Sequence, residues 1–447
     1  LEDEYDENGN RISKLDDKLK ELSKIYIFEK KYLDNQLDWL FTKKAINSFQ
    51  FGYFLSKLDE KYLIFNNLLE KLENIQGDFS LSLISGYLRG VFERDIKKRD
   101  SIIIEMIKDN NKIKWISEII CHSGLTDDMI LLMIELLLDD KIKIKDFEYI
   151  RFGSVLQNIS EEILSKLIET LVLKNNITSY SLCLNFISFY CEKVNANFSI
   201  PKELYIKILV NVINIDIHDK DYFYQLDDLY FEELSKKFIQ IYPDEYYLIT
   251  NKLIETFGLE KSITEHPHSH AINVLEDIIQ KRPAELWRII VKYLGPPIDK
   301  RAFKLRNWLR GDKFFKQFND KSKPAIEYIP IEEIYKWIDS DPEVRAWHFA
   351  SFVPNKLFKK DDEICFAREI LVKYGNEDKV KRNLRANFMT EGWTGPGSLH
   401  YEIKKQELIE FKKNENNSNV INWIDEFITI LDANIKREKI EEERLDR

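Results

Sequence analysis

The stretch Asp341-Pro342-Glu343-Val344-Arg345-Ala346-Trp347 decides the fold, because Ser418-Asn419-Val420-Ile421-Asn422-Trp423 repeats its layout. Each stretch begins with polar residues typical of a helix N-terminus. Each then places a Val and, three residues later, a Trp on one helix face. A weaker copy around Val380 lies between them. The three valines are 36 and 40 residues apart, close to the period of about 40 residues expected of HEAT-type helix pairs.

The composition favours helices throughout. Only 14 Gly and 11 Pro occur in 447 residues, while 44% of the residues are hydrophobic and 32% are charged. Scarce turn formers argue against a β-sandwich or barrel, and a chain of this length is too long for one compact core. We therefore predict an all-α fold, an irregular α-solenoid of HEAT-like helix pairs.

The chain divides by composition into five predicted segments. The strongest boundary signal is 261–271, a polar stretch without apolar periodicity that we interpret as a linker loop. The segments are a disordered or linker tail (1–14), an N-terminal helical-repeat region (15–260), the linker (261–271), a C-terminal HEAT-like helical region (272–436) and a charged helical tail (437–447).

Several functional classes are disfavoured by what the sequence lacks. It contains no GxxxxGK[ST], no GxGxxG after a strand, no HExxH and no Ser-centred elbow, so we expect neither catalysis nor a cofactor. No segment approaches the roughly 20 apolar residues that span a bilayer, so we expect no membrane partner. The four cysteines form no CxxC pair, which favours reduced thiols and a cytoplasmic location.

Three alternating histidines raise the question of a metal site. His266, His268 and His270 follow Glu265, and in an extended segment they would project to one side, where they could hold a transition metal. The pattern lacks a fourth ligand at helical spacing. A linker that caps the next helix through Ser269 explains the same residues, and we expect no metal.

The stretch 300–323 is basic and aromatic. It carries nine Lys or Arg residues against two Asp, which suits phosphates and bases or an acidic protein surface. The alternative is a helix whose aromatic side chains face the core while its charges face solvent. The predicted contact residues here are Arg306, Trp308, Arg310 and Lys313.

The stretch 216–233 is acidic and aromatic, with seven Asp or Glu residues. Tyrosines provide a large contact area at low entropic cost, so this stretch suits protein recognition. The alternative is a set of partly buried tyrosines beside a solvated charged face. The predicted contact residues here are Tyr222, Tyr224, Asp227, Asp228 and Tyr230.

Three of the fourteen glycines lie within 392–397, which indicates a specific backbone turn. We interpret this segment as a structural loop that clamps a neighbouring repeat, and a ligand site is the alternative. The residues of this predicted turn are Trp393, Gly395, Gly397 and His400.

Five segments stand out as a set: Ser85-Gly86-Tyr87-Leu88-Arg89-Gly90, Arg151-Phe152-Gly153, 341–347, 392–400 and 435–444. These segments resemble the C-terminal helical region of large bacterial antiphage-defence proteins. In those proteins an N-terminal effector, often with a STAND-type NTPase module, precedes helical repeats that sense a phage component. The resemblance implies that such modules lie upstream of this chain or in another chain, which fits the lack of an initiator Met.

Together, these observations predict a non-catalytic module that recognises a protein partner. The resemblance implies that this partner is a phage component or a fellow defence subunit, and that the chain belongs to a larger assembly. Two alternatives stay open: a nucleic-acid-binding module acting through 300–323, and a subunit of an enzyme.

Overall fold

The computed structural model describes residues 4–5, 11–12, 14–29, 31, 34–151, 155–214, 228–260, 262–265, 269–295, 298–311, 323–356, 365–390 and 395–445. Most of these residues are helical, which confirms the all-α prediction. The exceptions near the N-terminus are two strands of two residues each, β1 (Glu4–Tyr5) and β2 (Arg11–Ile12), which pair antiparallel. Among the described helices, none is both long and apolar enough to cross a membrane.

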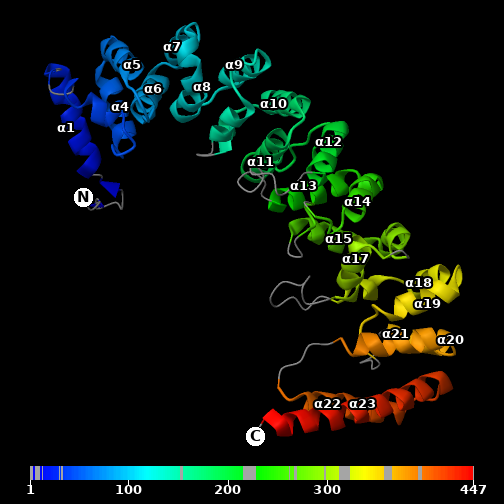
Figure 1. Ribbon diagram of the computed structural model, residues 1–447. Helices are drawn as coiled ribbons and strands as arrows, with labels where there is room; N and C mark the ends of the chain where they lie inside the picture. The colour runs from blue at the N-terminus through cyan, green and yellow to red at the C-terminus, as the bar shows by residue number, and fades with distance from the viewer. Residues whose placement is uncertain are drawn as a thin grey trace. The chain divides into compact units, whose positions relative to one another are not determined.

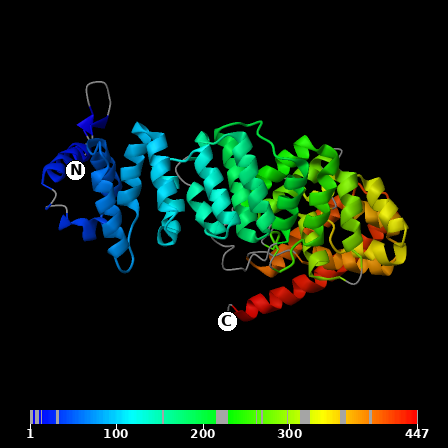
Figure 2. The ribbon, with the colours of Figure 1, turned by 90° about the horizontal axis from the view of Figure 1, so that it is seen from above.

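The chain divides into two compact units, one reaching from the N-terminus to Ile208 and one comprising mainly the chain from Phe231 onward. Within each unit, successive helices lie side by side in chain order (Figures 1 and 2). The first unit contains α1 (Lys14–Phe28), α3 (Leu37–Leu40), α4 (Ser48–Leu58), α5 (Leu63–Asn74), α6 (Ser82–Arg94), α7 (Ile96–Met106), α8 (Asn110–Ser123), α9 (Asp127–Leu138), η1 (Ile144–Arg151), η2 (Val155–Asn158), α10 (Glu161–Lys174), α11 (Ile177–Lys193) and the first part of α12 (Lys202–Ile213).

The second unit begins with the end of α12 and takes α13 from Phe231 onward, since the first residues of α13 belong to the first unit. Its elements are α13 (Asp228–Ile241), η3 (Pro243–Glu245), α14 (Tyr246–Glu255), α15 (His270–Lys281), α16 (Pro283–Ile290), η4 (Val291–Tyr293), α17 (Lys300–Arg310), η6 (Ala325–Tyr328), α18 (Ile331–Asp339), α19 (Pro342–Ala350), α20 (Phe366–Tyr374), α21 (Asp378–Phe388), α22 (Gly397–Lys412) and α23 (Ser418–Leu445).

The division into units falls before the predicted 261–271 linker, whose described residues pack inside the second unit. The Thr264 hydroxyl is fully buried, accepts a hydrogen bond from the amide of Gly258 and donates to the carbonyl of Thr256. Ser269 accepts from the amide of Ala271 at 3.2 Å, so it caps α15 as the sequence predicted. These polar side chains satisfy backbone groups, which explains how a segment without apolar periodicity packs closely.

Side-chain contacts between helices recur at one range of sequence separation. Many hydrogen bonds join residues that are 33 to 47 positions apart, in both units. This range matches the length of one helix pair in HEAT-type repeats. Examples are Asp127 with Ser160, Lys57 with Glu93, Asp339 with Lys373, Lys381 with Glu426 and Arg368 with Glu415.

Glycines hold α4 and α6 at short distance in the first unit. A Cβ atom on Gly52 would lie 2.2 Å from the carbonyl oxygen of Leu83, and one on Gly86 would lie 1.9 Å from that of Phe49. Gly90, one turn after Gly86, would meet a side-chain oxygen of α4 at 1.8 Å. No residue with a Cβ fits at these positions unless the helices move apart, so the glycines determine how closely the two backbones approach.

The Val–Trp motif has different surroundings in its copies. Val380, Val420 and Trp423 are buried, and the Trp423 indole donates to the carbonyl of Lys381 at 3.0 Å. In α19, by contrast, Trp347 is only half-buried, since the buried face of that helix is built mainly from Ala346, Phe349 and Ala350. The motif therefore identifies core positions in α21 and α23 but not in α19.

The charged C-terminal segment packs back on α22. The carboxylate of Glu442 accepts hydrogen bonds from the amide and the hydroxyl of Ser398, at 3.0 and 2.6 Å. Lys439 forms an ion pair with Glu402 at 2.7 Å. Glu442 thus serves as the N-terminal cap of α22, although it lies 44 residues along the chain from Ser398.

Candidate docking groove at the first helices

Two of the four residues predicted in the basic stretch are buried in α17. Arg306 and Trp308 are 6% and 2% exposed. The Arg306 Nη2 donates to the carbonyl of Leu294 at 2.5 Å and to Nδ1 of His348 at 3.2 Å. The burial of Trp308 matches the alternative of a helix whose aromatic side chains face the core, whereas the burial of Arg306 differs from that alternative, which placed the charges in solvent. The burial of both residues leaves their predicted contact role without support.

Arg310 also connects helices of the second unit. Its guanidinium donates to Oδ1 of Asn387 at 3.2 Å. Asn387 is buried and in turn donates to the carbonyls of Ala350 and Val353, at 3.3 and 2.7 Å. These hydrogen bonds connect α17, α19 and α21, so Arg310 has a packing role. Lys313 lies outside the described residues.

The acidic stretch is described only at its end. Tyr222, Tyr224 and Asp227 lie outside the described residues. Asp228 begins α13, and Tyr230 is half-buried within that helix. The proposed contacts of this stretch therefore stay a prediction.

His270, the first residue of α15, pairs with a carboxylate of helix α13. Its Nδ1 lies 2.6 Å from Oε2 of Glu232, which also accepts a hydrogen bond from Asn273 at 2.8 Å. Burial acts to raise the pKa of Glu232, but its hydrogen bonds hold that pKa below the ordinary value. His266 and His268 lie outside the described residues. Within the part of the chain that is described, no three His, Cys, Asp or Glu side chains are placed to hold a metal.

The predicted glycine turn leads directly into α22. Gly395 has φ of +97°, a conformation that favours glycine. A Cβ atom on Gly397 would lie 2.7 Å from Oε2 of Glu438, so this glycine lets α23 approach closely. His400 lies within α22, and Trp393 lies outside the described residues. The two glycines support the structural interpretation of this segment.

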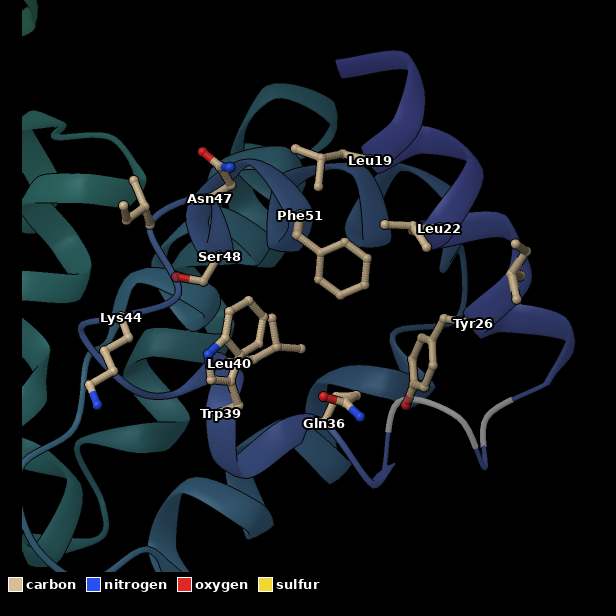
Figure 3. Close-up of a pocket in the computed structure, with 12 residues that line it drawn as sticks. Leu19, Leu22, Tyr26, Gln36, Trp39, Leu40, Lys44, Asn47, Ser48 and Phe51 are labelled. Carbon is tan, nitrogen blue, oxygen red and sulfur yellow. The ribbon is translucent and has the colours of Figure 1, made fainter. Parts of the chain in front are cut away.

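An apolar groove lies elsewhere, between α1 and the segment from α3 to α4 (Figure 3). It has a volume of about 470 Å³. Leu22 and Ile25, three residues apart on α1, form one wall, and Trp39 and Ile46 contribute to the other. These four side chains are 52%, 51%, 51% and 85% exposed. Large apolar side chains gathered and exposed in one place are characteristic of interaction sites.

The floor of the groove is built from buried side chains of the same helices. Leu19 and Tyr26 reach it from α1, Leu40 from α3 and Phe51 from α4. Figure 3 shows these side chains converging between the helices. Since α1 packs against α4, and glycines hold α4 close to α6, the groove rests on a closely packed support.

Tyr26 brings an unsatisfied polar group to this apolar lining. The residue is 3% exposed, and its hydroxyl has no hydrogen-bond partner among the described residues. Burial, followed by the carboxylates of Asp34 and Asp59, raises the pKa of Tyr26 to about 12. The hydroxyl therefore stays protonated at neutral pH and can both donate and accept.

Lys44 is the charged residue that lines the groove, and Figure 3 places it on the side away from Tyr26. Its side chain is exposed and forms no ion pair with any described residue. Its neighbour Lys43, by contrast, pairs with Asp78 at 2.7 Å and does not line the groove. The groove thus combines an apolar centre with one available positive charge.

A second cavity of about 610 Å³ lies between α5 and α7 and reaches the start of α8. Three lysines line it, but carboxylates already accompany two of them. Lys112 pairs with Glu73 at 2.7 Å and Asp109 at 3.3 Å, and Lys108 pairs with Glu105. Because these carboxylates offset the lysine charges, the cavity is a weaker candidate for an anion-binding site than its three lysines alone suggest.

The chain matches no known protein family model, no curated protein and no solved structure. Functional inference therefore rests on the residues described above. The resemblance to antiphage-defence proteins stays a prediction.

The groove residues were not among the candidates predicted from the sequence. A signal for them exists in α1, where Ile25 and Phe28 lie outside the stripe formed by Leu19, Leu22 and Tyr26. A helix that is apolar on more than one face indicates a second contact surface.

Proposed function

We propose that this chain is a non-catalytic helical-repeat module that binds a protein partner through the groove between α1 and α4. The observation that carries this proposal is the gathering of Leu22, Ile25, Trp39 and Ile46, all half or more exposed, around one cavity. When a partner covers apolar side chains exposed in this way, the complex is stabilised by about 25 cal/mol per Å² of apolar surface buried.

A repeat architecture supports a binding role. The recurring contact separations of 33 to 47 residues fit helix pairs that contact mainly their neighbours. Such arrays offer extended surfaces and transmit small packing changes along the chain. In the proposed role, docking of a phage component or a fellow defence subunit changes the packing of adjacent helix pairs and so favours an active assembly.

The two alternatives have less support. The nucleic-acid alternative depends on Arg306 and Arg310, which are engaged in packing the second unit. The enzyme alternative needs a shifted carboxylate or histidine in a cleft. The pKa of His348 is lowered to about 4, but this side chain is 2% exposed and lines neither of the two cavities described above.

The proposal is tested by affinity capture from phage-infected and uninfected bacterial lysates, with the full chain as bait. The Ile46→Glu variant places a charge in the groove, and Leu173→Glu, at a 73% exposed leucine of α10, is the matched control. We expect a protein that the wild type and Leu173→Glu retain at high salt and Ile46→Glu does not. Equal retention by all three baits would contradict the proposed site.

A further inference from the structure

The groove continues a row of helices in the first unit. α1 contacts α4, α4 contacts α6, and α6 contacts α8, so each inner member of this row has a helix on either side. α1 has α4 on one side, and Leu22 and Ile25 stand exposed along the groove. A helix placed in the groove would pack on α1 on one side and on the segment from α3 to α4 on the other, so it would have helices on either side as the inner members of the row do.

On these grounds we infer that the groove binds an amphipathic α-helix of a protein partner that carries a carboxylate beside its apolar face, where it meets Lys44. This inference rests on the proposed function and specifies its ligand. Helix-in-groove recognition uses apolar residues at positions i, i+3 or i+4, and i+7. Leu19 to Tyr26 corresponds to about 10 Å of helix, so about two turns of the partner fit along this wall.

Charge complementarity selects an acidic partner helix. Among the described residues that line the groove, Lys44 is charged and no carboxylate is present. Among the charged groups that shift the pKa of Tyr26, the carboxylate of Asp34 has the largest effect, so this negative charge acts at the end of the groove where Tyr26 lies. A helix bound along the groove therefore places its acidic residue toward Lys44 and away from Asp34.

Tyr26 adds a hydrogen-bonding requirement. Its buried hydroxyl lacks a partner in the described residues, and an unsatisfied buried hydroxyl costs about 1–3 kcal/mol. A polar side chain or a free carbonyl of the bound helix that reaches this hydroxyl removes that cost. The hydroxyl therefore contributes to affinity without contributing to the stability of the free chain.

Other occupants fit these features less well. A fatty acid could pair with Lys44, but walls that are half exposed leave much of an acyl chain in water, whereas small-ligand sites bury about 70–90% of their ligand. If two copies of this chain paired groove to groove, two concave surfaces would face each other and both grooves would stay unfilled. A convex helix from another protein fills the space.

The test selects helices from a large display library of helix-biased peptides, about 16 residues long, with the full chain as target and Ile46→Glu for counter-selection. We expect enriched peptides with an apolar stripe at helical spacing and an Asp or Glu beside it. Against such a peptide, Lys44→Glu should weaken binding about fivefold at low salt, and high salt should reduce this difference. Lys43→Glu is the matched control and should bind as the wild type does.

Two further variants sharpen the result. Replacing the peptide's acid with Lys should restore binding to Lys44→Glu, because the charges are exchanged. Tyr26→Phe should weaken binding about five- to tenfold while the unfolding midpoint of the free chain stays unchanged or rises. If the Tyr26 hydroxyl had only a structural role, Tyr26→Phe would lower the unfolding midpoint of the free chain instead.

Three results would overturn the inference: selection yields no helix that depends on Ile46, the enriched helices are basic, or a fluorescent long-chain fatty acid binds and displaces them. If the lysate experiment still shows groove-dependent capture, the proposed function stands and only the helix chemistry fails. If capture also proves independent of Ile46, both fail.

Discussion

The buried histidine of α19 should make the second unit sensitive to acid. His348 is 2% exposed, its Nδ1 accepts a hydrogen bond from Arg306 at 3.2 Å, and its Nε2 has no partner among the described residues. Burial, and then the adjacent Arg306 charge, lowers the pKa of His348 to about 4 from an ordinary value of 6.5. The folded chain therefore holds this imidazole neutral throughout the mildly acidic range.

The magnitude follows from the difference between the two pKa values. Because the unfolded chain binds a proton near pH 6.5 and the folded chain only near pH 4, stability is fully present above pH 6.5 and is lost as the pH falls. The expected loss is about 2 kcal/mol at about pH 5, and it approaches about 3.4 kcal/mol well below pH 4.

Urea unfolding at about pH 7.5 and pH 5 measures this loss. Tryptophan fluorescence reports mainly on the second unit, which holds six of the eight tryptophans: Trp287, Trp308, Trp337, Trp347, Trp393 and Trp423. Between the two pH values the wild type should lose about 2 kcal/mol more stability than a variant that lacks the imidazole.

That variant is His348→Gln, and His122→Gln controls for removal of an exposed histidine from the first unit. Each variant is compared with itself at the two pH values, so any constant cost of the substitution cancels. The reasoning is refuted if His348→Gln and the wild type lose stability in parallel between the two pH values.

Three further substitutions test the packing. Gly86→Ala forces a Cβ against the backbone of α4 and should cost about 3 kcal/mol or more in urea unfolding, whereas Gly295→Ala, with open space around it, should change stability by less than about 0.5 kcal/mol. Trp423→Ala removes a fully buried indole and should cost about 3–5 kcal/mol, and a smaller loss by the same assay would mean that the site collapses on itself. Glu442→Ala should speed amide hydrogen exchange at the start of α22, while Glu443→Ala, one residue along α23, should not; equal rates in both would argue against the cap.

Sequence patterns predicted the helical class because the apolar residues that mark a helix recur every three or four positions, within one short stretch of chain. The Val–Trp motif places Val and Trp on one helix face, but only the neighbouring helices decide that Trp423 is buried and Trp347 only half-buried. Gly86 and Gly90 were visible as a motif, but the cause of the motif, the backbone of α4, lies about 35 residues away in the chain.

The groove was not predicted, for a different physical reason. Leu22, Trp39 and Ile46 belong to separate segments, and a pattern shows which residues are apolar but not which of them the fold leaves uncovered. Arg306 shows the converse case. Its charge suggested a surface, whereas the carbonyl of Leu294 and the ring of His348 make burial of the guanidinium possible.

The recurring separation of 33 to 47 residues between bonded side chains has a mechanical consequence. Under tension applied at the two ends, a chain whose contacts span about one helix pair should yield pair by pair and not all at once. Each rupture would release about 40 residues, or about 14 nm of extended chain. Such a molecule can lengthen in small steps under load while the remaining pairs keep their internal packing.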